Sequence, residues 1–287
     1  ISNEGLELEL QADILRESAV SWRMKFNMAR NWNRFEKSYS GKDVVDGDGT
    51  LLVVGRPLNG LYVWAHRGYY NSDAEVPRLY KIDGQEIYFN GVATNGISGA
   101  VGDYRLLDLD GDGNPDSYYA GSPLPLAHGG WVNELMWKNF DLNVLVNFTI
   151  GRKMINNRMG LGFSRQSEDG HLTKLFDYRK LRPWDGVNKK PNAPAWGNSL
   201  SMNTDSAIEK VHHLALKQIT LGYNLPDRIS KKAGLSGVRF FLTAENLFYL
   251  SNYSGGNPEV VNIYTGRDNG DTYPLPRKYT LGLTLNF

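Results

Sequence analysis

The sequence predicts an all-β protein that forms part of a transmembrane antiparallel barrel. Three observations carry this prediction: apolar and polar residues alternate in several stretches, the connections between them alternate between short and long, and no apolar run is long enough for a membrane helix. The longest purely aliphatic run is 51–54, whereas a spanning helix needs roughly 18 apolar residues. If this chain crosses a membrane, it therefore does so with strands.

The composition narrows the class of protein further. The chain has 287 residues, 41% of them apolar, which is enough for one large domain or two ordinary ones. Its 32 basic and 31 acidic residues nearly cancel, so we expect no polybasic surface for nucleic acid. Because the chain has no cysteine, a disulfide framework, a thiol nucleophile and a thiolate metal site are excluded.

The first two predicted strands form a hairpin. Apolar residues occupy the even positions of 6–14 and of 22–28, and polar residues occupy the odd positions. This period of two indicates strands with one apolar and one polar face, joined by a turn at 16–19. In a membrane barrel the acids of the first strand would face the lumen. These acids are Glu7, Glu9 and Asp13.

A smaller hairpin is predicted farther along, where the apolar runs 51–54 and 61–65 bracket a turn from Gly55 to Gly60. The segment 68–126 is rich in Gly, Asp, Asn and Pro and would be unusually long for a loop in a compact soluble domain. It is ordinary for an extracellular excursion of a barrel.

Strand patterning returns in the second half of the chain. It covers 130–137, 142–150, 214–225 and 238–250. The closing strand, 279–287, carries apolar residues at every odd position and ends in Phe287. Taken alone, this last strand fits a soluble β-sandwich as well as the wall of a barrel.

The lengths of the connections favour the barrel. Short connections at 16–19, 138–140 and 226–237 alternate with long ones at 36–126, 156–208 and 251–276. Outer-membrane barrels have short periplasmic turns and long extracellular loops, so we expect the three long segments to be extracellular. The pattern gives about seven wall strands, fewer than the eight of the smallest bacterial barrels, so we expect further strands from residues outside this chain.

One loop has the spacing of a calcium site. Carboxylates stand at loop positions 1, 3, 5 and 9, a glycine stands at position 6, and a backbone carbonyl is available at position 7. The candidate ligands are Asp108, Asp110, Asp112, Asn114 and Asp116. Tyr119 replaces the usual bidentate Glu at position 12, so the site would be weaker unless a distant acid such as Asp103 completes it. An unoccupied acidic turn is the alternative. We expect a structural cation, Ca²⁺ in preference to Mg²⁺, that fixes the external loop.

The aromatic residues divide into two groups. Those near the ends of predicted strands suit an interfacial girdle and are Trp131, Trp137, Tyr223, Phe248 and Tyr249. Those in the long loops could contact a sugar or a partner protein, or could simply pack within the loops, and are Tyr69, Tyr70, Tyr118, Trp184 and Trp196.

No catalytic arrangement is predicted. His212 and His213 are adjacent, so in a strand they point to opposite faces and cannot jointly hold a metal. The other histidines are isolated, and the sequence contains no Ser/His/Asp arrangement, phosphate-cradling glycine loop or nucleotide motif. We therefore do not expect an enzyme.

Several ordered phrases together resemble the SusC/RagA class of TonB-dependent outer-membrane transporters. They extend from the start of the chain to its end and are NEGLEL at 3–8, DLDGDG at 108–113, LKQITLGYNLP at 216–226, AENLF at 244–248, YSGGNPE at 253–259, and YPLPR at 273–277 followed by YTLG at 279–282.

The resemblance implies a 22-stranded barrel in the bacterial outer membrane, closed by a plug and capped by a SusD-like lipoprotein. Such transporters import oligosaccharides, and in some members peptides, with energy delivered by TonB. The resemblance makes this chain the C-terminal part of the barrel, with the plug and the earlier strands not in it. It also makes Phe287 the signal that the barrel-assembly machinery recognises.

Three alternatives to oligosaccharide import stay open. They are peptide import by the same machinery, a passive porin, and a calcium-stabilised carbohydrate-binding β-sandwich. Solubility without detergent would favour the sandwich, because its apolar faces would meet in a dry core. The identity of the cargo does not follow from the scaffold.

Overall fold

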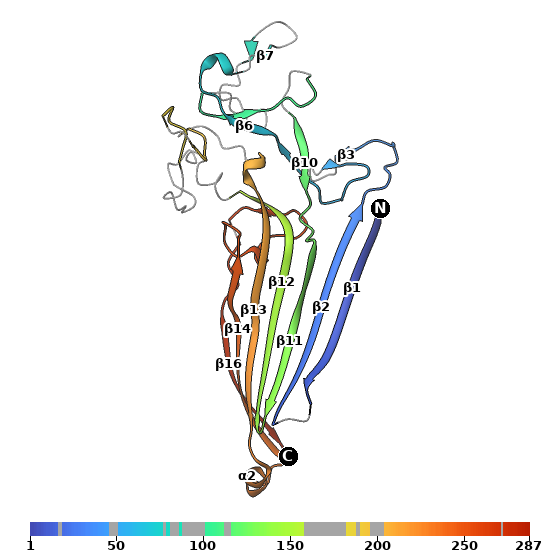
Figure 1. The fold of residues 1–287 in the computed structure, drawn as a ribbon, viewed down its shortest axis with the longest axis vertical. Helices are drawn as coiled ribbons and strands as arrows, with labels where there is room; N and C mark the ends of the chain where they lie inside the picture. Colours follow the sequence, from blue (N-terminus) through green and yellow to red (C-terminus); the bar gives the residue numbers. More distant parts are fainter. Residues whose placement is uncertain are drawn as a thin grey trace.

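The computed structural model describes residues 1–16, 19–45, 51–76, 79–80, 86–87, 101–111, 116–157, 182–187, 190–195, 204–270 and 272–287. Most of these residues form one tall, curved sheet of long strands, and the long connections gather at one end of it, the upper end in Figure 1. The C-terminus lies at the opposite, lower end, beside a short helix.

The main sheet is eight-stranded and almost wholly antiparallel. Seven long strands follow one another in the order β1 (Ser2–Leu15), β2 (Val20–Arg34), β11 (Ala127–Trp137), β12 (Phe140–Asn156), β13 (Ile208–Asn224), β14 (Gly237–Ser251) and β16 (Lys278–Asn286). The eighth, β15 (Arg267–Asp268), pairs in parallel with the upper end of β12. The prediction of an all-β antiparallel wall is confirmed, because the long strands are those that the alternation indicated. Strands β1 and β16 form the two edges of the sheet.

Short elements fill the connections. At the upper end they are β3 (Val44–Val45), β4 (Leu51–Leu52), β5 (Leu61–Trp64), β6 (His66–Tyr69), η1 (Asp73–Glu75), β7 (Leu79–Tyr80), β8 (Glu86–Ile87), β9 (Tyr104–Leu106), β10 (Ser117–Gly121), η3 (Asp205–Ala207) and η5 (Pro258–Val260). At the lower end they are α2 (Asp227–Ser230) and η4 (Lys231–Ala233). No helix in the described part of the chain is long and apolar enough to cross a membrane.

The predicted small hairpin around residues 55–60 is wrong. Strand β4 pairs with β3, and β5 pairs with β10, more than 50 residues farther along the chain. The reason is burial: Leu61 and Val63 of β5 pack with Ala120 of β10 and with Ile155 at the upper end of β12. A local pairing with β4 would give up this apolar cluster, which contributes more than a short hairpin alone.

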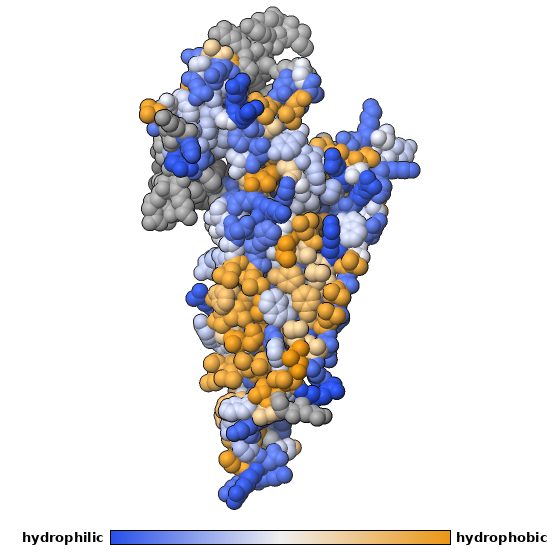
Figure 2. Space-filling view, in the orientation of Figure 1, coloured by the Kyte–Doolittle hydropathy of each residue, from blue (hydrophilic) through white to orange (hydrophobic). Residues whose placement is uncertain are grey.

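One face of the sheet is apolar and exposed. The register places Leu142, Leu221, Leu242 and Leu281 side by side across β12, β13, β14 and β16. Leu221 is 48% exposed and Leu281 is 81% exposed. Figure 2 shows apolar side chains gathered over the middle of the long strands, with polar side chains above and below. We call this the outward face.

Two small cores close the upper end of the sheet, one on each face of β12. Ile155 lies in the cluster with Leu61 and Val63, whereas its neighbour Met154 packs with Val211 and Tyr253. Both Met154 and Ile155 are 0% exposed. The long connections are therefore joined to the wall through the top of β12.

Candidate functional site

The face opposite the outward face, which we call the inward face, carries charged side chains paired across strands. Lys25 of β2 contacts Glu134 of β11 at 2.8 Å, and Lys278 of β16 contacts Glu245 of β14 at 3.1 Å. Because the pairs join different strands, they support the register of the sheet as well as balancing charge on a surface that is partly exposed.

A third inward pair spans a whole strand. Arg239 of β14 reaches Asp141 of β12 at 2.5 Å, across Gly222 of β13. A Cβ at Gly222 would collide with both the carboxylate and the guanidinium. Because Gly222 has no side chain, Arg239 and Asp141 can approach each other over it and form the ion pair.

Aromatic rings line the outward face near its lower rim. The ring of Phe140 stacks on Trp137, with centroids 6.1 Å apart, and contacts Tyr223 at 4.7 Å. A second group lies eight residues higher on β12, where Phe148 is 6.2 Å from Trp131. Eight residues of strand span about 26 Å, which is close to the height of the apolar band of a membrane barrel.

The adjacent residues Phe248 and Tyr249 do not share a face. Phe248 is opposite Leu216, in line with the outward residues of β13, and Tyr249 is opposite Ala215. Because successive side chains of a strand alternate, only Phe248 suits the outward aromatic girdle.

In the external region, Tyr69 and Tyr118 belong to a network that joins two of the long connections, the one before β11 and the one before β13. His66 and Tyr118 both hydrogen-bond the carboxylate of Asp205, Tyr118 at 3.1 Å. Tyr104 lies between the His66 ring, 4.6 Å away, and the Tyr69 ring, 5.4 Å away. Burial raises the pKa of Tyr69 and of Tyr104 above the ordinary value of a tyrosine. The sequence offered no signal for Asp205, which is 139 residues from His66.

The other loop aromatics have different surroundings. Tyr70 is buried, at 5% exposure, which favours packing within the loop over contact with a ligand. Trp184 is half-buried, donates a 3.2 Å hydrogen bond to Asn71, and lies against Gly102. Trp196 lies outside the described residues.

Three of the proposed metal ligands converge. Carboxylate oxygens of Asp108, Asp110 and Asp116 all lie within 4.8 Å of one another. The loop holds them there with its own backbone: the N–H of Leu109 donates to Asp116 at 2.6 Å, and that of Gly111 donates to Asp108 at 2.6 Å. Three carboxylates so close repel one another, and a hard divalent cation is the ligand that would neutralise them. Asp112 and Asn114 lie outside the described residues.

Phe287 lies at the lower end of the sheet, 93% exposed. Its backbone carbonyl accepts a 3.3 Å hydrogen bond from Ser236, at the end of the turn before β14. The ring is therefore free to contact another molecule.

Comparison with known proteins gives relatives along the whole chain, although no family model matches. The chain is 25% identical to TonB-dependent receptor P3 and 27% identical to TonB-dependent receptor P26, both of Formosa agariphila, and it spans 29% of the length of each. It is 26% identical to TonB-dependent receptor SusC of Bacteroides thetaiotaomicron, of which it spans 26%. All of this chain is covered in each case.

Solved structures share the fold of this chain. A structure of the RagAB peptide transporter matches 99% of this chain with a TM-score of 0.70 and 24% identity, and this chain covers 29% of it. A second, of the RagAB peptide importer in a closed state, gives a TM-score of 0.68.

Proposed function

We propose that this chain belongs to the SusC/RagA class of TonB-dependent receptors and supplies wall strands of an outer-membrane barrel that imports oligosaccharides. The observation that carries the proposal is the two-faced sheet: its outward face is apolar and exposed, and its inward face is polar and ion-paired. In water such a large exposed apolar face would promote aggregation, whereas in a bilayer it is the surface that a barrel presents to lipid.

The proposal assigns the rest of the barrel to residues outside this chain. The chain spans less than a third of the length of its relatives, and β1 and β16 each have one unpaired edge in the described sheet. Open edges are not tolerated in the hydrocarbon region, so further strands must pair there. In this scheme 1–287 is the C-terminal part of one barrel domain, 36–126, 156–208 and 251–276 are extracellular loops, and the plug lies elsewhere.

Three partners follow from this assignment. A SusD-like lipoprotein would contact the external loops, TonB would engage the plug-bearing part of the receptor, and the barrel-assembly machinery would recognise Phe287. The names of the relatives are those of receptors and transporters, which supports a role in uptake and not in catalysis.

A bound Ca²⁺ in the external loop is part of the proposal. Asp108, Asp110 and Asp116 already converge, and Asp112 and the carbonyl of Asn114 would complete the set. The ion would be structural, since it would fix one loop above the wall and lies far along the chain from the inward charged pairs.

Oligosaccharide is the preferred cargo because Tyr118 and Trp184 present partly exposed rings in the external region, and ring faces suit sugars. Peptide is the second candidate, favoured by the structural neighbours, which are peptide transporters. A passive porin or a soluble sandwich is less consistent with the outward face and with the receptor relatives.

A growth and uptake experiment tests the proposal. Cells that lack the receptor would be compared with the parent strain on defined oligosaccharides and on defined peptides, with uptake measured before and after a protonophore. We expect the deletion strain to lose uptake of an oligosaccharide, and the parent to lose it on de-energisation. Uptake that survives de-energisation would indicate a porin, and loss confined to peptides would indicate the second cargo.

A further inference from the structure

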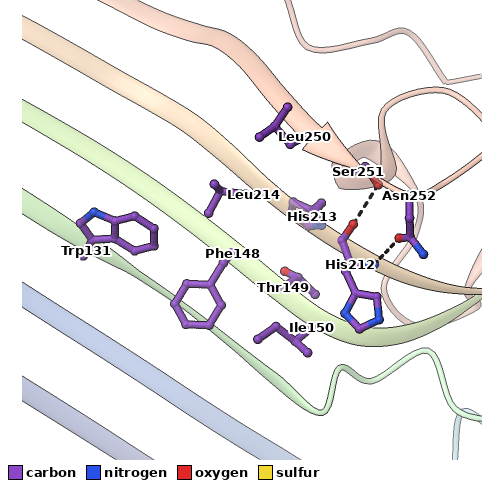
Figure 3. Close-up of a pocket in the computed structure, with 10 residues that line it drawn as sticks. All are labelled: Trp131, Phe148, Thr149, Ile150, His212, His213, Leu214, Leu250, Ser251 and Asn252. Atoms are coloured by element: carbon purple, nitrogen blue, oxygen red, sulfur yellow. Dashed lines mark hydrogen bonds between the residues drawn. The ribbon is translucent and has the colours of Figure 1, made fainter.

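An apolar groove lies on the outward face, at the upper edge of the apolar region. Its volume is about 580 Å³, and it is shallow and open along the outward face. Figure 3 shows the side chains around it, which come from β11, β12, β13 and the end of β14. The main contributors are Trp131, Phe148, Ile150, His212, Leu214 and Leu250.

A bulge shapes the upper end of this groove. Thr149 is opposite His213 and Arg152 is opposite Val211, so Ile150 and Gly151 of β12 together face His212 alone. Gly151 takes a φ of +72°, which suits glycine at such a bulge. Below the bulge, Phe148, Leu214 and Leu250 stand opposite one another in register, and they form the apolar floor.

Side chains satisfy the backbone where β14 ends. The N–H of His212 donates to the side-chain oxygen of Asn252 at 2.7 Å, and the carbonyl of His212 accepts from the Ser251 hydroxyl at 3.0 Å (Figure 3). The side-chain amide of Asn252 also donates to the carbonyl of Lys210 at 2.8 Å. These backbone groups at the rim of the groove are therefore hydrogen-bonded by the protein itself. This is required in a lipid environment, where no water is available to them.

The charge above the groove is positive. Lys210 lies two residues above His212 on the same face of β13, because side chains of a strand repeat every second residue. Its side chain is exposed, and no ion pair of Lys210 is found within the described residues. Lys153 of β12 stands directly opposite in register, but its ammonium donates to the backbone carbonyl of Ala120, so Lys210 is the cation that remains above the groove.

We propose that this groove binds one acyl chain of an anionic membrane lipid, whose phosphate lies against His212 and Lys210. The inference rests on the proposed function, since it requires the outward face to meet the bilayer. Along this face of β13, Leu216 and Leu214 give way to His212 and then Lys210, the order of tail, interface and headgroup in a lipid. Cargo would not reach this groove, because its apolar side chains point away from the inward face.

Native mass spectrometry of the complete receptor tests this proposal. Delipidated receptor would be titrated with palmitoyl-oleoyl phosphatidylglycerol and, separately, with the zwitterionic phosphatidylcholine of the same chains. We expect one phosphatidylglycerol to bind at least tenfold more tightly than phosphatidylcholine. The double substitution Lys210→Gln with His212→Gln should remove this preference, and Leu214→Trp, which fills the groove, should weaken both lipids at least tenfold.

Matched controls separate the groove from the rest of the surface. Leu221→Trp lies on the same face of β13 but lower in the apolar region, and Lys232→Gln lies in the turn at the lower end of the sheet. Both should bind lipid like the parent receptor. Lys210→Arg should also keep the preference, so a comparison of Lys210→Gln with Lys210→Arg serves if the double variant does not fold.

Two results would overturn the proposal: equal binding of the two lipids by the parent receptor, or unchanged binding after Leu214→Trp. Failure of the proposed function would look different. In that case the receptor would be missing from the outer-membrane fraction, whereas failure of the lipid site alone would leave it there and leave cargo uptake unchanged.

Discussion

The guanidinium of Arg152 donates a 2.9 Å hydrogen bond to the backbone carbonyl of Val261. The same side chain also donates to the carbonyls of Asn262, at 2.7 Å, and Pro258, at 3.2 Å. Arg152 is 5% exposed and stands near the top of β12, so one buried cation holds the turn that contains η5 against the wall.

Replacing this residue should loosen that turn. Arg152→Met removes the donors of three carbonyls and should cost about 1–3 kcal/mol in local opening. Hydrogen exchange of the complete receptor would measure this as faster exchange in residues 257–268. Arg228→Met, at an exposed position in α2, is the control and should leave exchange unchanged. Unaltered protection in Arg152→Met would mean that apolar packing alone holds the turn.

Removal of the proposed calcium ion should loosen the acidic loop. Asp110→Asn deletes one charge from the cluster with Asp108 and Asp116, so we expect loss of bound calcium in elemental analysis and faster hydrogen exchange in residues 101–111. A chelator should reproduce the effect in the parent receptor. Asp73→Asn, an exposed acid of η1, should retain the metal. A parent receptor without stoichiometric calcium would refute the site.

The inward face of the closing strand should not accept a side chain at Gly282. The ring of Phe241 lies over this glycine so closely that a Cβ would collide with it. Gly282→Ala should therefore destabilise the pairing of β14 with β16 by about 1–3 kcal/mol, as overpacking does. The folded fraction on heat-modifiability gels measures this. Thr284→Ala, the next inward position, is the control, and equal effects in the two variants would disprove the contact.

Deletion of Phe287 should impair assembly more than transport. Its ring is exposed at the lower end of the sheet, where it is available to an assembly factor. We expect less receptor in the outer membrane, with uptake per assembled molecule unchanged. Phe287→Tyr, which keeps an aromatic ring, should assemble normally. Normal assembly after the deletion would exclude this role.

The two faces of β13 should differ in their response to charge. Leu221→Arg places a cation on the outward face, where lipid would surround it, and should cost about 2–4 kcal/mol. Gln218→Arg places the same side chain on the inward face and should be tolerated. Urea unfolding in liposomes measures both values. Equal costs would argue that the outward face does not meet lipid.

The wall could be predicted from the sequence because its signal is local. A strand with lipid on one side and polar groups on the other alternates apolar and polar residues with a period of two. This alternation is visible in each long strand of the sequence. The acidic loop was likewise visible, since Asp108, Asp110 and Asp116 fall within one short turn.

Contacts between distant residues could not be predicted. The pairing of β5 with β10 is decided by burial against Ile155, and the carboxylate of Asp205 contacts His66 from a different long connection, 139 residues along the chain. Bulges such as the one at Gly151 shift the register of a strand pair without changing the apolar pattern. The groove beside His212, which this bulge shapes, could therefore not be predicted from the sequence.

The burial of Met154 and Ile155 on opposite faces has a mechanical consequence. The top of β12 is packed on both faces, so apolar contacts on each side anchor the external connections to this wall strand. A force applied to the external connections would therefore be transmitted directly to the wall strand. Loop and wall would therefore tilt together.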